Sequence, residues 1–341
     1  MTADWLINYN HGFLNRGLFG TLFLNIFDNQ ESMLDSLSFI LISVYIFIFY
    51  FLSKIFNSFN QNIISVVMIF SPATFLFNIY DSQGSFRKEI IGILALVILA
   101  SNIISIKEYQ IYLSGFIYTI AIFSHSVNLF FFTTIIYILF IKMKSVNYRY
   151  YFLFIGSTLV NLLSNVLFSN SEDELKIKKD LICEDLDKLD LSNLCGYGSF
   201  EFLTWDLNAA FLITQNYIIN ENRESSYLYI LLFCISILPL LFDKNNYKQI
   251  KYYLLVGISF TPLFLLAYDW GRWIYIVSIC FLVIYLSSDS KEKNNKYLYA
   301  FIIYPFIFRV EHCCNPLTNF EGNFFIKNIE YIFANFLNIL R

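Results

Sequence analysis

The chain has 341 residues, of which 57% are hydrophobic, 20% are aromatic and only 14% are charged. A soluble domain carries about a quarter charged residues, and the apolar residues here come in unbroken blocks rather than at amphipathic spacing. The composition therefore excludes an ordinary soluble protein, and the formal net charge of −3 gives no indication of nucleic-acid binding. We predict an all-α, polytopic transmembrane helical bundle.

Apolar runs predict about ten membrane helices in a single integral domain covering residues 1–341. The runs lie at about 37–52, 63–79, 90–106, 111–124, 127–142, 152–168, 226–242, 252–268, 273–287 and 297–308. The stretch 111–142 is too long for one span and short for two. The turn at Ser124-His125-Ser126 is therefore a candidate for a position inside the membrane. No signal peptide, internal repeat or low-complexity linker is visible.

Basic residues predict the orientation of the bundle, because cytoplasmic loops are enriched in Lys and Arg. One set of alternate loops is short and holds 11 basic and 4 acidic residues, whereas the other set holds 12 basic and 22 acidic residues. The short basic loops are expected in the cytoplasm. Three long segments are expected outside: residues 1–36, 169–225 and 309–341. An external N-terminal segment leaves two alternatives, translocation by the first helix or a further helix upstream of Met1.

Four cysteines fall on the predicted outer side, where an oxidising compartment allows disulfides. They are Cys183, Cys195, Cys313 and Cys314. The favoured pairing is Cys183 with Cys195, although sequence alone does not determine connectivity.

The segment Asp81–Glu89 is a polar hinge between two apolar runs, and it ends in Arg87, Lys88 and Glu89. Basic residues are normally depleted outside the membrane, so a basic pair at the start of a helix suggests anion binding. Glu89 is a candidate base or a partner for Arg87. The structural alternative is interfacial anchoring by the basic pair.

Two further polar positions are predicted on the same side. Leucines and Ile26 at four-residue spacing suggest an interfacial amphipathic helix over residues 13–27, with Arg16 facing the head groups or a cleft. A more specific hypothesis is that Asp4 has a catalytic role and that Arg16 binds a phosphate group. His125 lies between apolar stretches, where a histidine usually faces a cavity and can act as a general base; a packing hydrogen bond is the alternative.

The outer loops add candidate sugar contacts. Asp269, Trp270 and Arg272 lie in a tight turn, where they form either a local ion pair with interfacial tryptophans or a site that binds phosphate through Arg272 and a sugar through Asp269 and Trp270. The mixed charge of residues 170–190 predicts a solvated helix. Residues 199–220 are amphipathic and suggest a helix on the membrane surface, with Trp205 and Asp206 as candidate sugar contacts. No zinc spacing, phosphate-cradling glycine loop or nucleophile elbow is present.

The stretch from Asp4 through Gly-Phe-Leu-Asn-Arg-Gly-Leu-Phe-Gly20, together with Arg87 at a helix start and His125 some 35 residues later, resembles a family of bacterial membrane proteins. These motifs are similar to those of Wzy-type and EpsG-type polymerases of O-antigen or capsule. The ten-helix layout resembles the GT-C glycosyltransferases. Those proteins have a helix before the first external loop, which this chain lacks.

The resemblance implies a glycosyltransferase that acts on polyprenyl-diphosphate-linked glycans at the outer face of the bacterial inner membrane, polymerising repeat units. Arg16, Arg87, Lys88 and Arg272 would stabilise the leaving diphosphate, and Asp4, Glu89 or His125 would act as base. The implied partners are the lipid-linked oligosaccharide, membrane lipids, a chain-length regulator and a flippase. No cofactor is expected, and a divalent metal is left open.

Three alternatives remain at this point. The first is a GT-C-type transferase that adds one sugar from a polyprenyl-phosphate donor. The second is a membrane O-acyltransferase that uses His125. The third is a lipid-linked glycan flippase, for which charges and broken helices at mid-membrane would be expected.

Overall fold

The computed structural model describes residues 3–14, 16–58, 63–81, 84, 86–101, 107–142, 148–196, 198–221, 223–242, 249–288, 302–303 and 308–313. Within these residues the secondary structure is helical and contains no strand, as the composition predicts. The chain forms two compact units, one of Met1–Phe59 with Phe86–Leu212 and one of Asn60–Ser85 with Ile213–Arg341. One of the passages between the units, from Ser85 to Phe86, falls within the polar hinge Asp81–Glu89.

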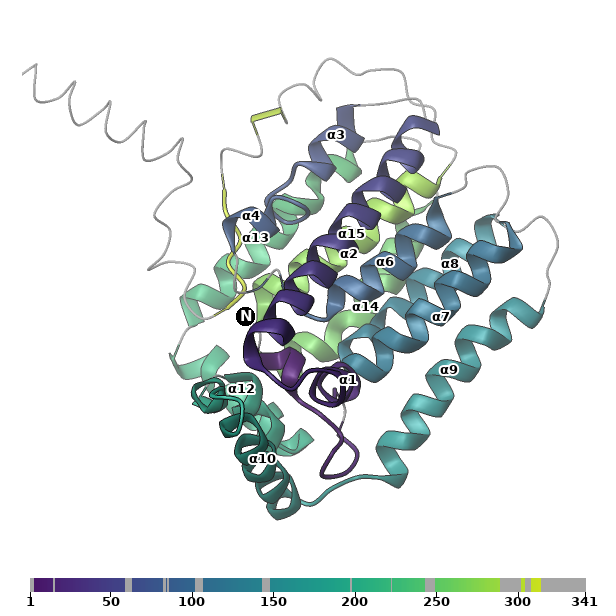
Figure 1. The fold of residues 1–341 in the computed structure, drawn as a ribbon. Helices are drawn as coiled ribbons and strands as arrows, with labels where there is room; N and C mark the ends of the chain where they lie inside the picture. Colours follow the sequence, from purple (N-terminus) through teal and green to yellow (C-terminus); the bar gives the residue numbers. More distant parts are fainter. Residues whose placement is uncertain are drawn as a thin grey trace, which may run out of the picture. The chain divides into compact units, whose positions relative to one another are not determined.

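The first unit is built around α6 (Glu89–Ala100), every residue of which is buried. Helices α2 (Gln30–Ser58), α7 (Glu108–Ser124) and α8 (Phe131–Lys142) pack against α6, and α9 (Tyr148–Leu167) packs against α7 (Figure 1). A helix that is apolar on all sides is expected to be buried, and the sequence of α6 has that character.

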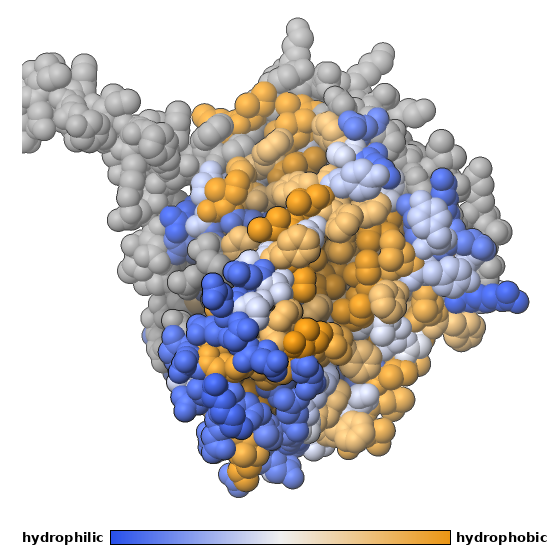
Figure 2. Space-filling view, in the orientation of Figure 1, coloured by the Kyte–Doolittle hydropathy of each residue, from blue (hydrophilic) through white to orange (hydrophobic). Residues whose placement is uncertain are grey.

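The remaining elements of the first unit are shorter. They are η1 (Ala3–Leu6), α1 (Leu18–Ile26), η2 (Ser126–Phe130), α10 (Glu172–Asp187), η3 (Ser192–Gly196), α11 (Gly198–Glu201), η4 (Phe202–Thr204) and the first part of α12 (Leu207–Asn216). The solvated helix predicted in residues 170–190 is confirmed as α10, which begins with a capping box between Ser171 and Glu174. Figure 2 shows hydrophilic side chains over α10 and a hydrophobic surface over α2.

The helix predicted over residues 13–27 is shorter than expected, because it begins at Leu18. The residues before it fold back, and Ala3–Asn8 among them are buried. A Cβ atom on Gly20 would lie 2.1 Å from the carbonyl oxygen of Ile7, so only glycine allows this close approach. The segment is therefore packed inside the unit rather than laid out as one continuous helix.

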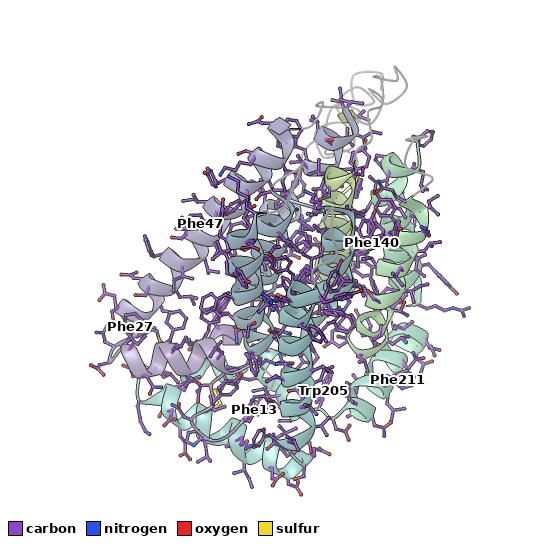
Figure 3. The ribbon with its side chains drawn as sticks, turned by 90° about the vertical axis from the view of Figure 1, so that its right-hand side faces the viewer. Phe13, Phe27, Phe47, Phe140, Trp205 and Phe211 are labelled. Carbon is purple, nitrogen blue, oxygen red and sulfur yellow. A yellow bond between two sulfur atoms is a disulfide. The ribbon has the colours of Figure 1, made fainter. Side chains whose placement is uncertain are left out.

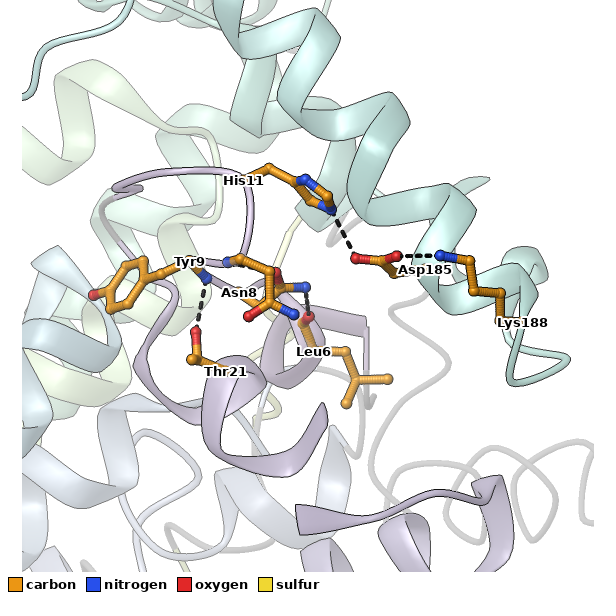
Figure 4. A network of polar contacts seen from close by, with 8 residues as sticks. Leu6, Asn8, Tyr9, His11, Thr21, Asp185 and Lys188 are labelled. Carbon is orange, nitrogen blue, oxygen red and sulfur yellow. Dashed lines mark hydrogen bonds and ion pairs between the residues drawn. The ribbon is translucent and has the colours of Figure 1, made fainter. Parts of the chain in front are cut away.

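Polar contacts fasten the same N-terminal segment to α10 (Figure 4). His11 Nε2 lies 2.7 Å from Asp185 Oδ2, and Lys188 donates to the other oxygen of that carboxylate at 2.7 Å. Asn170, just before α10, donates to the carbonyl of Phe13 at 3.1 Å. The disulfide between Cys183 and Cys195 ties α10 to η3 (Figure 3), and this is the pairing that the sequence favoured.

The second unit contains five described helical elements and a π-helical turn. They are α3 (Ile63–Ile69), α4 (Phe77–Tyr80), the π-helical η5 (Tyr217–Glu221), α13 (Arg223–Leu241), α14 (Ile250–Leu266) and α15 (Trp270–Ser287). Helix α15 is buried from Gly271 to Ser287 and packs against α3, α13 and α14.

The predicted helix over residues 63–79 is interrupted in the structure. Helix α3 ends at Ile69, and α4 begins only at Phe77. Pro72 disfavours helical backbone at Ser71, and the single proton of the Thr74 hydroxyl lies within reach of the carbonyls of Met68, Ile69 and Ser71.

Three described helices are long and apolar enough to cross a membrane, and they cover Gln30–Asn57, Tyr148–Leu167 and Trp270–Ser287. Four shorter apolar helices cover Glu89–Ala100, Ser126–Lys142, Ser226–Leu241 and Ile250–Leu266. Phe47 on α2 and Phe140 on α8, labelled in Figure 3, are 52% and 61% exposed, as expected for side chains that face lipid. The count of about ten spans stays a prediction, and most of the last run, 297–308, lies outside the described residues.

Candidate functional site

A cluster of buried charges lies in the first unit and contains residues from four separate parts of the sequence. We call it the ionic cluster, and its members are Asp4, Arg16, Arg87, Lys88, Glu89 and His125. Asp4 belongs to η1, and Arg16 precedes α1. Arg87 and the N-cap residue Lys88 directly precede α6, whose first residue is Glu89, and His125 is the C-cap residue of α7. The sequence proposed all six for function without showing that they meet.

Two hydrogen bonds hold the N-terminal segment against the start of α6. The indole of Trp5 is fully buried and donates to the carbonyl of Phe86 at 2.8 Å. The ammonium of Lys88 donates to the carbonyl of Arg16 at 2.6 Å. These contacts bring Asp4 and Arg16 to the charged end of the hinge.

Asp4 is the most unusual member of the ionic cluster. Its side chain is 2% exposed, neither carboxylate oxygen accepts a hydrogen bond, and Arg16 Nη1 lies 3.7 Å from Oδ1. Burial alone would raise the pKa of this carboxyl, but the surrounding positive charges hold the pKa well below its usual value. Those charges come, in decreasing order of effect, from Lys88, His125, Arg16 and Arg87. Asp4 is therefore an ionised carboxylate with unused acceptor capacity.

Lys88 is more deeply placed than a phosphate ligand at a membrane surface would be. It is fully buried, and this burial lowers its pKa to about 8 although the neighbouring Asp4 charge acts in the opposite direction. Arg16 and Arg87 are partly exposed. The two arginines are thus better placed than Lys88 to meet an external anion, with Lys88 as the buried charge behind them.

Glu89 and His125 form the other side of the ionic cluster. Both side chains are buried, and His125 Nε2 lies 3.9 Å from Glu89 Oε1. The other ring nitrogen, Nδ1, accepts the backbone N–H of Val127 at 3.1 Å and so caps η2. This bond is a local cap of η2 and not a hydrogen bond between packed helices, and it leaves Nε2 facing the Glu89 carboxylate.

The other predicted phosphate ligand, Arg272, lies in the second unit at the start of α15. Its guanidinium is 3.1 Å from Asp269 and 4.3 Å from the centre of the Trp273 ring. Both are local contacts, as in the ion-pair alternative drawn from the sequence. Trp270 donates to the Phe264 carbonyl at 2.9 Å.

Trp270 also forms part of an apolar pocket between α13, α14 and α15. The pocket has a volume of about 700 Å³. Aromatic side chains contribute much of its lining: Tyr229, Phe233, Tyr253, Phe264, Trp270 and Phe281. Such a lining suits a hydrocarbon better than a sugar.

The predicted sugar contacts Trp205 and Asp206, in the first unit, make local contacts. Trp205 packs edge-on against Phe202 with ring centres 4.5 Å apart. Asp206 Oδ1 accepts the N–H of Ala209 at 2.6 Å and caps α12. These contacts account for both residues structurally.

One conspicuous polar pair was not assigned from the sequence. Asp81 Oδ2 accepts the backbone N–H of His312 at 2.5 Å and lies 2.6 Å from its Nδ1, while Oδ1 accepts the N–H of Gly84. Burial would raise the pKa of Asp81, but these hydrogen bonds and the His312 charge lower it. The two residues are 231 positions apart, so no local pattern could have revealed the pair.

Comparisons with known proteins provide no family for this chain. No family model matches it, and neither the curated proteins nor the solved structures contain a match. Its chemistry therefore has to be argued from its own residues. Among the described residues, no group of three His, Cys, Asp or Glu side chains is arranged to hold a metal ion.

Proposed function

We infer that this protein is a membrane glycosyltransferase that acts on polyprenyl-diphosphate-linked glycans at the outer face of the bacterial inner membrane, joining repeat units into a polymer. The observation that carries the proposal is the ionic cluster. Residues chosen from the sequence for base and phosphate roles lie together in one unit, although the chain separates them by up to 121 positions, from Asp4 to His125.

The composition of the cluster fits the reaction. A departing lipid diphosphate develops negative charge, which Arg16 and Arg87 would stabilise with support from Lys88. The acceptor hydroxyl must lose a proton, and a carboxylate or imidazole of the cluster would receive it. Two buried carboxylates beside three or four cations leave a net positive site that attracts an anion.

The second unit, taken by itself, contains a pocket between α13, α14 and α15 that is of the kind that binds hydrocarbon. The ten-span topology with outward-facing long loops, and interfacial roles for α1 and α12, belong to this proposal. Leu207, Phe211 and Leu212 on α12 are well exposed, as a helix lying on a membrane surface requires.

The test is deletion of the gene in its host, followed by gel analysis of the surface glycan. Loss of the ladder of bands from long glycan chains, with retention of the band for one repeat unit, supports a polymerase. A full-length glycan that lacks one sugar favours the single-sugar transferase, and one that lacks an acyl group favours the acyltransferase. Lipid-linked glycan retained at the inner face favours the flippase.

A point variant tests the phosphate role in the same assay. Arg87→Ala is expected to lower polymerisation about 10²- to 10³-fold with normal protein levels, the cost of losing one preorganised charge at a leaving group. Arg223→Ala is the matched control, because its side chain is exposed at the start of α13. Normal chains from the Arg87 variant would exclude the phosphate role.

A further inference from the structure

The hydrogen bonding of His125 determines which of its ring nitrogens carries a proton. Nδ1 lies 3.1 Å from the backbone nitrogen of Val127, which can only donate. Nδ1 must therefore present its lone pair, and the neutral ring then has its proton on Nε2. Nε2, the ring nitrogen nearer to Glu89, therefore carries a proton in either charge state.

A ring in this state is a poor base for a substrate. Its lone pair is already used by the backbone, and the Nε2 proton is directed at the Glu89 carboxylate, 3.9 Å away. This separation exceeds hydrogen-bonding distance, so the N–H dipole and the carboxylate interact only electrostatically. Glu89, in contrast, is an acceptor that can take a proton.

Packing between α6 and η2 keeps the two groups in this relation. Asn128, three residues after His125, donates to the carbonyl of Ala121 at 2.9 Å. Gly92 stands one turn after Glu89, and a Cβ atom there would lie 2.3 Å from Asn128 Oδ1. The absence of a side chain at Gly92 lets the turn that carries His125 approach the first turn of α6.

We propose that Glu89 is the base of this site and that His125 is its positioning residue, held with the Nε2 proton toward the carboxylate by the Val127 N–H. The proposal rests on the function given above and assigns roles within it. Glu89 takes the proton of the acceptor hydroxyl as that oxygen bonds to the anomeric carbon. The bond from that carbon to the diphosphate breaks, and the diphosphate leaves with the electron pair. Asp4, Arg16, Arg87 and Lys88 complete the charges around the two groups.

The first test reads the histidine directly and needs no activity. The chain contains three histidines, so ring-¹⁵N labelling gives three sets of signals, and His125→Asn identifies the one that belongs to His125. At a pH where the ring is neutral, we expect a protonated Nε2 and an unprotonated Nδ1. A proton on Nδ1 would overturn the proposal, whatever the substrate of the protein.

The second test separates the roles by pH–rate profiles of glycan transfer by the purified protein. Glu89→Gln is expected to lower the rate about 10²- to 10⁴-fold and to remove the acidic limb of the profile. The transfer rate of His125→Asn should fall only about tenfold, as expected for the loss of one charge-assisted contact. Its pH–rate profile should keep an acidic limb at a shifted pH. An asparagine oxygen can still accept the Val127 N–H and preserve the cap.

The opposite pattern, an acidic limb lost with His125→Asn and kept with Glu89→Gln, would make His125 the base and refute the assignment. Glu89→Asp provides a second variant with the carboxylate retained, and it should keep the acidic limb at a reduced rate. Absence of transfer by the wild-type protein from any lipid-diphosphate glycan would overturn the proposed function and the base role with it. The ring-¹⁵N result would then still report the tautomer.

Discussion

At the scale of single residues, the buried charges of the ionic cluster depend on one another. Burial disfavours the charged form of Lys88, and the Asp4 carboxylate favours it, with a resulting pKa of about 8. Burial favours the neutral form of Asp4, and the Lys88 charge is the largest of the charges that oppose this effect. Each group therefore keeps its charge because the other is present, and a change in one should be visible in the titration of the other.

The titration of Lys88 predicts how activity changes at alkaline pH. Because Lys88 loses its proton near pH 8, the rate of the wild-type protein should fall as pH rises through about 8, measured as kcat/KM between pH 6 and 10. Lys88→Met should be slower and lack this limb. Asp4→Asn should move the limb to lower pH, because the carboxylate raises the Lys88 pKa. An unchanged limb in Lys88→Met would contradict the assignment.

The lowered pKa of Lys88 also predicts how the stability of the folded protein changes with pH. The Lys88 pKa in the folded protein, about 8, lies below its ordinary value of 10.5. The unfolded chain thus binds more protons between these two values, and stability should rise with pH across that window. Thermal unfolding in detergent should show this rise for the wild-type protein and a smaller one for Lys88→Met. Equal slopes would exclude Lys88 as its source.

At the scale of elements, close approach between helices determines the geometry of the site. Helix α6 contacts η2 through Gly92, and the same turn of η2 is fixed to α7 by Asn128. The ionic cluster thus sits where the start of α6 meets the end of α7. A side chain added at this junction should alter the site without touching a charge.

Gly92→Ala tests that junction. Its Cβ would lie 2.3 Å from Asn128 Oδ1 and 2.6 Å from the Phe131 ring, so we expect a loss of about 1–3 kcal/mol in stability and reduced activity. Gly156→Ala on α9 is the matched control, since nothing lies within 4 Å of the added carbon. Detergent unfolding and transfer rates measure both variants. Wild-type behaviour of Gly92→Ala would show that the junction can relax.

The disulfide between Cys183 and Cys195 predicts a second effect at this scale. Cys195→Ser should lower stability by about 2–4 kcal/mol, because the bond closes a loop between α10 and η3. Cys234→Ser, at a free cysteine, is the control and should be neutral. Variants are preferable to a reductant because Cys313 is also disulfide-bonded. An unaffected melting temperature in Cys195→Ser would show that contacts from α10 suffice.

At the scale of the whole molecule, the distribution of basic residues predicts how the chain crosses the membrane. A reporter that is active only outside the cytoplasm, fused after residue 189, should be active, and one fused after residue 146 should be inactive. The reason is the positive-inside bias of the short loops. Activity in the opposite order would reverse the topology and place the ionic cluster on the cytoplasmic side.

From the sequence we could predict the helical membrane class and the α10 helix, and we could favour, without deciding it, the Cys183–Cys195 pairing. These predictions follow from local properties: the length of the apolar runs, the mixed charge of residues 170–190, and the position of both cysteines in one loop on the predicted outer side. The sequence also singled out Asp4, Arg16, Arg87–Glu89 and His125, because charged and histidine side chains beside apolar runs are costly and call for a reason.

Only the tertiary structure decided which of these residues meet. Contacts such as Lys88 with Arg16, Glu89 with His125, and Asp81 with His312 join positions far apart in the chain, and they depend on how closely helices pack. The same holds for residues 63–79, where a turn that contains Pro72 and Thr74 separates α3 from α4. The apolar runs of the sequence indicate which segments are buried in lipid or protein. Where the charged residues that lie between these runs meet depends on how closely the helices pack at glycines and turns.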